Sequence, residues 1–158
     1  MSADRPAAPE TRLVTGADGL RRFFAGLVEQ VFQTDLGVAD PSLTDYLSDL
    51  LVRFLPAGPP AGGLTGALIE ADRTEGEPRR ESYRLAGDVA LFWTGVYPAR
   101  LRARGTADAL LDVPAVGKAA YRAAAGTPEE PRPVLLRLAD QFDLCGDGLA
   151  RVRAEWSG

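Results

Sequence analysis

GDVALFWTGVYPARLRARG, residues 87–105, decides how this chain of 158 residues folds. Apolar side chains recur every three or four positions through this stretch and its approach: Leu85, Val89, Phe92 and Val96. A second apolar row lies beside the first, so the pattern predicts the most buried helix of the chain. Pro98 must end or kink this helix, because proline has no N–H to donate to the carbonyl group of Thr94.

Two helices before this central helix are expected to pack as a pair. Apolar steps of three and four predict the first at about residues 17–35. The second begins where Asp40 can cap it and Pro41 suits the first helical position, and Pro56 ends it. A short link that contains Gly37 joins the two helices, which favours an αα-hairpin.

The central helix is predicted to begin at Pro78, and three further helices are predicted around it. A weak helix carries Leu64, Leu68 and Ile69, and Asp112 caps an alanine-rich helix. The last helix has the most regular spacing, with seven apolar residues on one seam: Leu135, Leu138, Phe142, Cys145, Leu149, Val152 and Trp156. This seam is too long to be left in water, so we expect Phe142 to be buried within one chain, with the helix packed against the central one.

These patterns predict an all-α fold: a single-domain helical bundle of about five to seven helices with a long C-terminal helix. No segment shows the alternation of a strand. Residues 1–14 are polar and contain prolines, and they are expected to form a disordered N-terminal leader. Residues 15–158 then make up the single helical domain, because a chain of this length can bury one sizeable core.

The composition argues against several classes of partner. The chain is 46% hydrophobic and 25% charged, as soluble globular proteins are, and its net charge of −4 gives no field that would recruit nucleic acid. No run approaches the roughly 18 apolar residues of a membrane span, and the first residues lack the apolar core of a signal peptide. The single cysteine cannot form an internal disulfide. We therefore expect a cytoplasmic protein without nucleic-acid or membrane partners.

The side-chain inventory argues against most enzymes. Histidine is absent, which removes the commonest general base and most zinc and haem ligation. Cys145 lies on the apolar seam, where a free thiol acts as a small hydrophobic group. Asp140, Asp143 and Asp147 share the opposite face of that helix, which is typical of a solvated face and not of a cation site. No catalytic residue, metal ligand or cofactor is predicted.

Asp88 is the one acid within residues 87–105, and two interpretations of it stay open. A carboxyl group in an apolar site can have a raised pKa and act as a general acid, which would make Asp88 part of a ligand site. Alternatively, Asp88 pairs with Arg84 one helical turn earlier and has a structural role. The pair is favoured, because buried charges are normally paired.

The exit of the central helix is the predicted place of a ligand or interaction site. A kink at Pro98 opens space between helices, and Trp93, Tyr97 and Arg100 are residue types that suit binding surfaces. Arg100 and Arg104 share a helix face and could clamp an anionic group. The alternative is that these cations are solvated and complement the negative end of the helix dipole.

Segments along much of the chain resemble a family of bacterial all-helical proteins of similar length. They are LTDYLSDLLVRF, LAGDVALFWTGVYPARLRARG, VGKAAYRAAAG and LLRLADQFDLCGDGLARV, and the similarity spans about residues 20–155. The motif-like positions are Tyr46, Gly87, Asp88, Phe92, Gly95, Pro98, Gly117 and Tyr121. No activity is assigned to that family, so the resemblance implies a self-standing helical domain and carries over no catalytic residue.

Three classes of function remain. The favoured one is a non-enzymatic protein-interaction module or small homo-oligomer, because the surface chemistry is bland and the C-terminal seam can extend a bundle or pair with a second copy. The alternative is a binder of a small apolar or anionic ligand in a pocket between helices near Tyr97. An enzyme is the least favoured class and would have to work through carboxylates, tyrosines and arginines.

Overall fold

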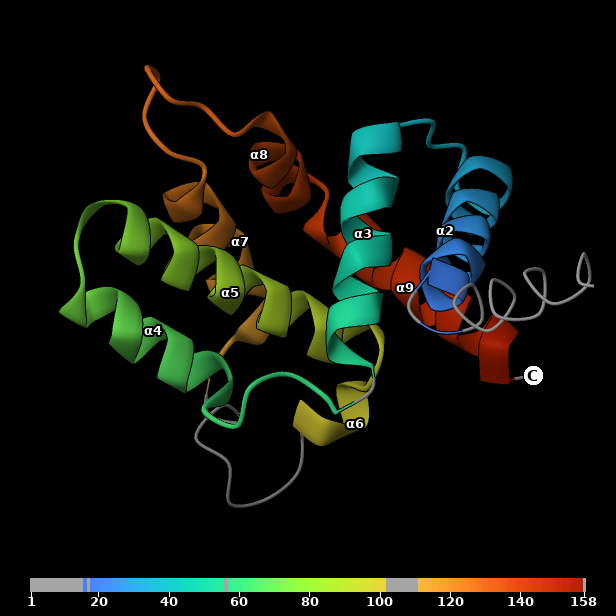
Figure 1. Ribbon diagram of the computed structural model, residues 1–158, viewed down its shortest axis with the longest axis horizontal. Helices are drawn as coiled ribbons and strands as arrows, with labels where there is room; N and C mark the ends of the chain where they lie inside the picture. Colours follow the sequence, from blue (N-terminus) through green and yellow to red (C-terminus); the bar gives the residue numbers. More distant parts are fainter. Residues whose placement is uncertain (1–15, 17, 56, 102–110, 158) are drawn as a thin grey trace, which may run out of the picture.

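The central helix of the sequence, α5 (Gly76–Gly95), packs against α4 (Gly63–Arg73) along one side and against α7 (Val113–Ala124) along another (Figure 1). It starts at Gly76 instead of at Pro78, which occupies the first turn, where the missing N–H costs no hydrogen bond. Every residue from 86 to 92 is buried, so α5 forms the centre of the core.

The structure is a computed structural model that describes residues 16, 18–55, 57–101 and 111–157. The predicted leader at residues 1–14, Pro56 and Arg104 lie outside these ranges. The other elements are α2 (Gly19–Gln30), the π-helical segment η2 (Val31–Asp35), α3 (Pro41–Phe54), α6 (Pro98–Leu101), α8 (Pro133–Asp140) and α9 (Phe142–Ser157). Within the described ranges all elements are helical, which confirms the predicted all-α class. None of these helices combines the length and apolar composition that a bilayer span requires.

Eight α-helices are found in the described ranges, where about five to seven are predicted for the chain. One additional helix arises because α5 ends at Gly95 and Pro98 opens the separate, short α6. This arrangement is the predicted effect of Pro98, since proline suits the first turn of a helix and not its interior. Another additional helix arises in the C-terminal segment.

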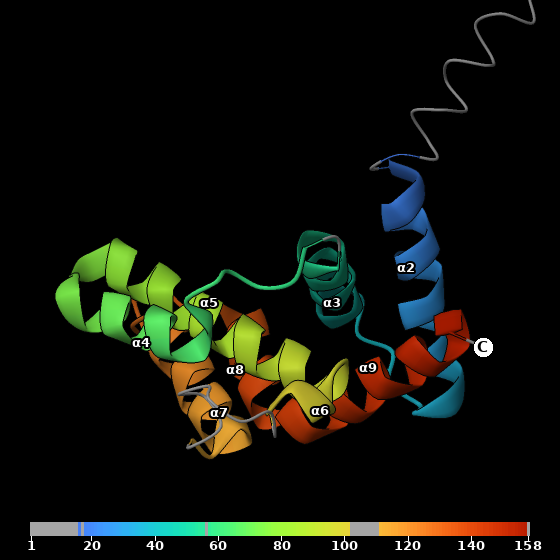
Figure 2. The ribbon, with the colours of Figure 1, turned by 90° about the horizontal axis from the view of Figure 1, so that it is seen from below.

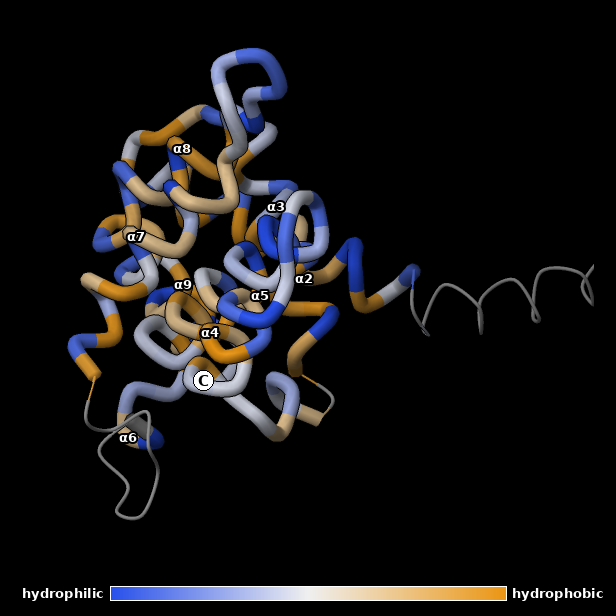
Figure 3. Tube along the Cα trace, turned by 90° about the vertical axis from the view of Figure 1, so that its left-hand side faces the viewer, coloured by the Kyte–Doolittle hydropathy of each residue, from blue (hydrophilic) through white to orange (hydrophobic). Residues whose placement is uncertain are grey.

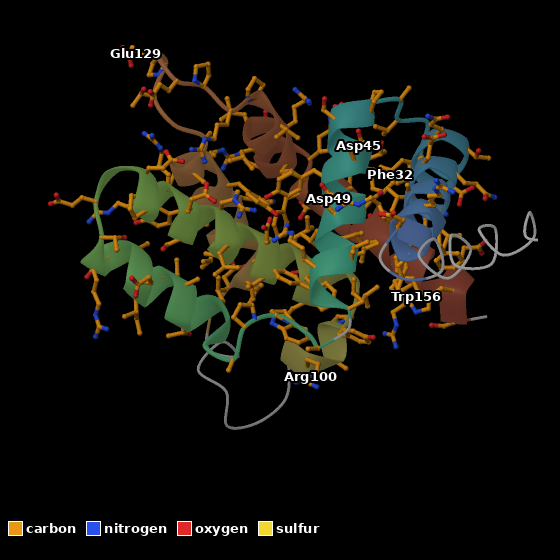
Figure 4. The ribbon with its side chains drawn as sticks, viewed as in Figure 1. Phe32, Asp45, Asp49, Arg100, Glu129 and Trp156 are labelled. Atoms are coloured by element: carbon orange, nitrogen blue, oxygen red, sulfur yellow. The ribbon has the colours of Figure 1, made fainter. Side chains whose placement is uncertain are left out.

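The predicted long C-terminal helix is confirmed as α9, but it begins at Phe142, because the segment from Leu135 to Trp156 forms two helices instead of the predicted one. At Gln141 the backbone leaves the helical conformation, with φ −110° and ψ 26°. The division lets α8 pack against α7 and α3, while α9 runs past α5 to α2 (Figures 1 and 2). The first six seam residues are buried, and Phe142 is 0% exposed, which confirms its predicted burial within one chain. Trp156 lies near the end of α9 (Figure 4). Its ring centroid is 5.3 Å from that of Phe24 of α2.

The N-terminal helices α2 and α3 form the predicted pair. Asp40 caps α3, because its carboxylate accepts a hydrogen bond from the backbone N–H of Leu43 at 3.2 Å, and Pro41 occupies the first turn. Gly37, with φ +69°, turns the chain between the two helices in a left-handed conformation that glycine adopts without strain. The first predicted helix differs from expectation in its last turn, which is the π-helical η2.

α4 is covered mainly on the side that faces α5. Leu64, Ala67 and Ala71 are buried there, whereas Ile69, which is predicted to belong to the apolar face, is 47% exposed. Leu64 and two alanines thus form the buried face of α4, and Leu68 packs against the core while Ile69 does not. Figure 3 shows hydrophilic and hydrophobic residues alternating along the helices of the bundle, the pattern expected of helices with one apolar face.

Aromatic rings lie directly against glycines at the interfaces between helices. A Cβ atom on Gly87 would lie 2.5 Å from the ring of Tyr121, too close for any side chain. The same arrangement recurs at two other positions, and we call the three the glycine–ring pairs: Gly87 with Tyr121, Gly117 with Phe142, and Gly148 with Phe32. The helices can approach closely here because one partner contributes only backbone.

Replacing Gly87 with alanine should lower the free energy of unfolding by about 1–3 kcal/mol, because the new methyl group overlaps the ring of Tyr121. Gly66→Ala in α4 is the matched control, since no atom lies within 4 Å of its Cβ position. That change should be neutral or stabilise the protein by about 0.5–1 kcal/mol. Urea unfolding followed by circular dichroism measures both variants, and equal effects of the two changes would contradict the close approach at Gly87.

Candidate functional site

Asp88 lies on α5, is 0% exposed, and accepts four hydrogen bonds from three helices. Its Oδ1 accepts from the phenol groups of Tyr46 and Tyr121, each at 2.7 Å. Its Oδ2 accepts from the guanidinium groups of Arg53 at 3.1 Å and Arg84 at 3.0 Å. We call these five residues the Asp88 cluster. The cluster ties α3, α5 and α7 together at the centre of the molecule.

The pair of Asp88 with Arg84 is the one that the sequence predicts, and the 3.0 Å contact confirms it. The sequence reasoning missed the other three partners, which come from 33 to 42 residues away in the chain. A helical spacing rule identifies neighbours only on the same helix. A weaker signal was present, because Tyr46, Asp88 and Tyr121 are all motif-like positions of the resemblance.

The protonation states of the Asp88 cluster fit a carboxylate that accepts from four donors. Burial raises the pKa of the Asp88 carboxyl group above its ordinary value, and Arg53, Tyr121, Arg84 and Tyr46 reduce this shift without cancelling it. Burial and the nearby Asp88 charge raise the pKa of both tyrosines, so the phenols keep their protons and donate. Both oxygens of Asp88 are thus fully used within the protein, which favours a structural role over general acid catalysis.

Ion pairs extend the Asp88 cluster toward the start of α8. Arg84 also donates from Nε to Glu81 at 3.0 Å, and Glu81 accepts from Arg132 at 2.8 Å. Arg132 in turn pairs with Glu77, which Arg80 contacts at 2.7 Å. Burial raises the pKa of Glu81, but the hydrogen bonds from Arg132 and Arg84 outweigh burial, and this pKa lies below its ordinary value. Charges of alternating sign therefore follow the exposed edge of α5.

A cavity of about 560 Å³ lies at the exit of α5, and we call it the Tyr97 cavity. Its lining residues come from α5 and α6 and from the end of α3, the link to α4 and the first turn of α4. The lining residues are Phe54, Leu55, residues 57–63, Thr65, Phe92, Trp93, Tyr97 and Arg100. Three predicted site residues, Trp93, Tyr97 and Arg100, therefore meet at one cavity, whereas Asp88 does not line it.

Four aromatic rings form the inner wall of the Tyr97 cavity. The ring of Phe92 lies at the centre, 5.4 Å from Phe54, 5.4 Å from Trp93 and 5.7 Å from Tyr97 between ring centroids. Phe54 and Phe92 are buried and hold the wall in place, while Trp93 and Tyr97 are half-buried. The wall is thus a fixed apolar surface with two rings that a bound molecule can contact.

Arg100 lies on α6 at the rim of the Tyr97 cavity (Figure 4). Its guanidinium carbon is 5.2 Å from the centroid of the Trp93 ring, the geometry of a cation–π contact. Arg104, the other predicted cation, lies outside the described residues, so the shared face of Arg100 and Arg104 stays a prediction.

Arg153 of α9 holds Tyr97 in position, a role that the sequence reasoning missed. Its guanidinium carbon lies 4.3 Å from the centroid of the Tyr97 ring. Its Nη1 donates to the carbonyl oxygen of Val96 at 2.8 Å, which satisfies an acceptor at the end of α5. No local pattern links Arg153 to Tyr97, because their contact depends on how α9 crosses α5.

The remaining candidate groups have structural environments. Cys145 is buried, and burial raises the pKa of its thiol to about 12, so the thiol is protonated near neutral pH and is a poor nucleophile. Asp140, Asp143 and Asp147 are exposed, as predicted for a solvated face, and Asp143 contacts Lys118 at 3.0 Å. The described residues include no group of three or more Cys, Asp or Glu side chains that could hold a metal ion.

Comparison of the chain with models of known protein families, with curated proteins and with solved structures gives no match. The resemblance of about residues 20–155 to a family of bacterial helical proteins therefore stays a prediction. A function for this chain has to be argued from its own geometry, and the Tyr97 cavity is the feature that offers one.

Proposed function

We propose that this protein binds a small molecule in the Tyr97 cavity. The observation that carries the proposal is a cavity of about 560 Å³ with four aromatic rings on its inner wall. Small-molecule sites are typically concave, mostly apolar and about 300–1,000 Å³ in volume, with a few polar groups that orient the ligand. The Tyr97 cavity falls within this range of volume, polar and apolar atoms contribute about equally to its lining, and Arg100 is its charged group.

The packing of the C-terminal seam supports ligand binding over an interaction module. The sequence favours an interaction module only while the seam is free to meet a second chain. In the structure, α8 and α9 bury six of the seven seam residues within the chain, and the half-buried Trp156 packs against Phe24 of α2. That apolar surface is already used within one chain, so the main argument for a partner protein loses its basis.

The neutral aromatic dye N-phenyl-1-naphthylamine, which fluoresces in apolar surroundings, tests the proposal. We expect one dye molecule to bind per chain, with energy transfer from Trp93. The measurement uses a Trp156→Phe protein, in which Trp93 is the one remaining tryptophan. Ala61→Phe, which places a ring in the cavity, should weaken dye binding at least about tenfold, a loss of about 1.4 kcal/mol.

Ala119→Phe provides the control for the dye experiment. Ala119 is exposed on α7 and does not line the Tyr97 cavity, so this variant should bind the dye as the parent protein does. Dye binding that both variants leave unchanged, or that both weaken equally, would contradict a site in the Tyr97 cavity.

A homo-oligomer is the second candidate, and two exposed apolar side chains on α2 support it. Leu20 and Phe23 are 37% and 51% exposed and stand one helical turn apart on the same face. Light scattering would then give twice the mass of one chain, and Phe23→Glu would restore the monomer. A monomeric mass at high protein concentration would argue against this candidate.

A further inference from the structure

Arg100 is the one charged side chain among the described residues that line the Tyr97 cavity. Its guanidinium carbon lies over the Trp93 ring, and its side-chain N–H groups donate no hydrogen bond to another described residue, so they can bind an acceptor. Among the described residues no carboxylate pairs with Arg100, in contrast to Arg84 and Arg137, which pair with Asp88 and Asp40. The described lining of the cavity therefore has one positive charge without a partner among the described residues, and it contains no acid that would repel an anion.

The residues that line the Tyr97 cavity favour a ligand with a flat and mostly apolar ring system. Trp93 and Tyr97 line one side with aromatic rings, and Arg153 fixes the ring of Tyr97 from behind without lining the cavity. The opposite wall, residues 57–63, consists of glycine, alanine and proline and carries no charge. Flat aromatic molecules fill such a space well, because they stack on ring faces and ring edges.

Arg100, as the one cation in the described lining, favours ligands with one negative charge over ligands with two. A guanidinium group and a carboxylate match in charge and can form two parallel N–H···O hydrogen bonds. A phosphate monoester carries about 1.5 to 2 negative charges at pH 7, so one arginine would leave part of that charge without a partner. The pairing of one arginine with an otherwise uncharged lining therefore fits a monoanion.

We propose that the Tyr97 cavity takes a planar aromatic carboxylate. Its ring lies against Trp93 and Tyr97, and its carboxylate accepts hydrogen bonds from Arg100. This inference rests on the proposed function and adds the chemical class of the ligand. Arg153 is a positioning residue in this arrangement, because it acts on the ligand only through Tyr97.

The test pair is 2-naphthoate and its neutral amide, 2-naphthamide, which share one ring system and differ in charge. We expect 2-naphthoate to displace N-phenyl-1-naphthylamine with an affinity about tenfold higher than that of the amide, as a charge-assisted hydrogen bond provides. Arg100→Gln should remove this preference and leave the affinity for the amide unchanged. Arg151→Gln, at an exposed position of α9 away from the cavity, should change neither affinity.

Arg153→Met separates positioning from charge recognition. It should weaken both naphthalene ligands by the same factor and keep the preference for the carboxylate. Equal affinities for the two ligands in the parent protein, or a preference that survives Arg100→Gln, would overturn the aromatic carboxylate as the ligand class. If dye binding persists in that case, the proposed function stands. If the dye and both naphthalene compounds fail to bind, the proposed function itself is overturned.

Discussion

Replacing Asp88 with alanine should lower the free energy of unfolding by about 3–5 kcal/mol, the cost of breaking a buried ion pair. The change removes the acceptor of four hydrogen bonds and leaves the buried phenol of Tyr121 without one. Asp88→Asn should cost less, about 1–3 kcal/mol. Its single oxygen can serve the two phenols or the two guanidinium groups, but not both pairs. Urea unfolding at pH 7 measures both variants.

Asp143→Ala is the control for the Asp88 variants, because Asp143 is an exposed acid with one lysine partner. Surface ion pairs of this kind contribute about 0–1 kcal/mol, so the control should stay close to the parent protein. If the Asp88 variants unfold at the same urea concentration as the parent protein but lose dye binding, the role of Asp88 is in ligand binding and the structural assignment is wrong.

Phe142→Ala should lower the free energy of unfolding by about 3–5 kcal/mol, the usual cost of deleting a buried phenylalanine ring. Phe142 is the first residue of α9, and its ring packs against the backbone of Gly117 and 6.2 Å from the ring of Tyr121. Gly117 has no side chain that could move into the space, so we expect a cost near the upper end of this range. Thermal and urea unfolding both report the change.

A second substitution tests the same contact from the other side. Gly117→Ala alone should destabilise the protein, because its Cβ would lie 2.6 Å from the ring of Phe142. In the Phe142→Ala background the overlap with the ring is gone and only the 2.8 Å approach to the Cβ atom of Ala90 remains, so Gly117→Ala should cost less than in the parent protein. A double-mutant cycle measures this coupling, and additive effects of the two changes would rule out the packing of Gly117 on Phe142.

Features that depend on neighbouring residues could be predicted from the sequence. Asp40 and Asp112 each accept a hydrogen bond from an N–H three residues later, so their caps are visible in a short window. Pro98 marks the end of α5 for the same reason, because its effect on the backbone is local. The position of the Tyr97 cavity at the end of α5 could be predicted from Pro98 and from the aromatic residues beside it.

Features that depend on distant residues could not be predicted in this way. Gln141 divides the C-terminal helices without a glycine or proline, because α8 and α9 pack against different neighbours. The partners of Asp88 on α3 and α7 meet it only after the bundle has formed, and so does Arg153 with Tyr97. The contribution of residues 57–63 to the cavity wall likewise depends on where α4 lies.

The three glycine–ring pairs also limit how this sequence can change over generations. A side chain can be added at one of these glycines only if the facing ring is trimmed, so two changes that are harmful separately become acceptable jointly. One pair lies at each successive interface, from α5 to α7, from α7 to α9, and from α9 to η2. A slip of one turn, about 5.4 Å, would set a side chain against the ring. The glycine–ring pairs thus fix the axial register of α5, α7, α9 and η2. Related sequences in which the glycine and the facing ring have changed together would be expected to form the same bundle.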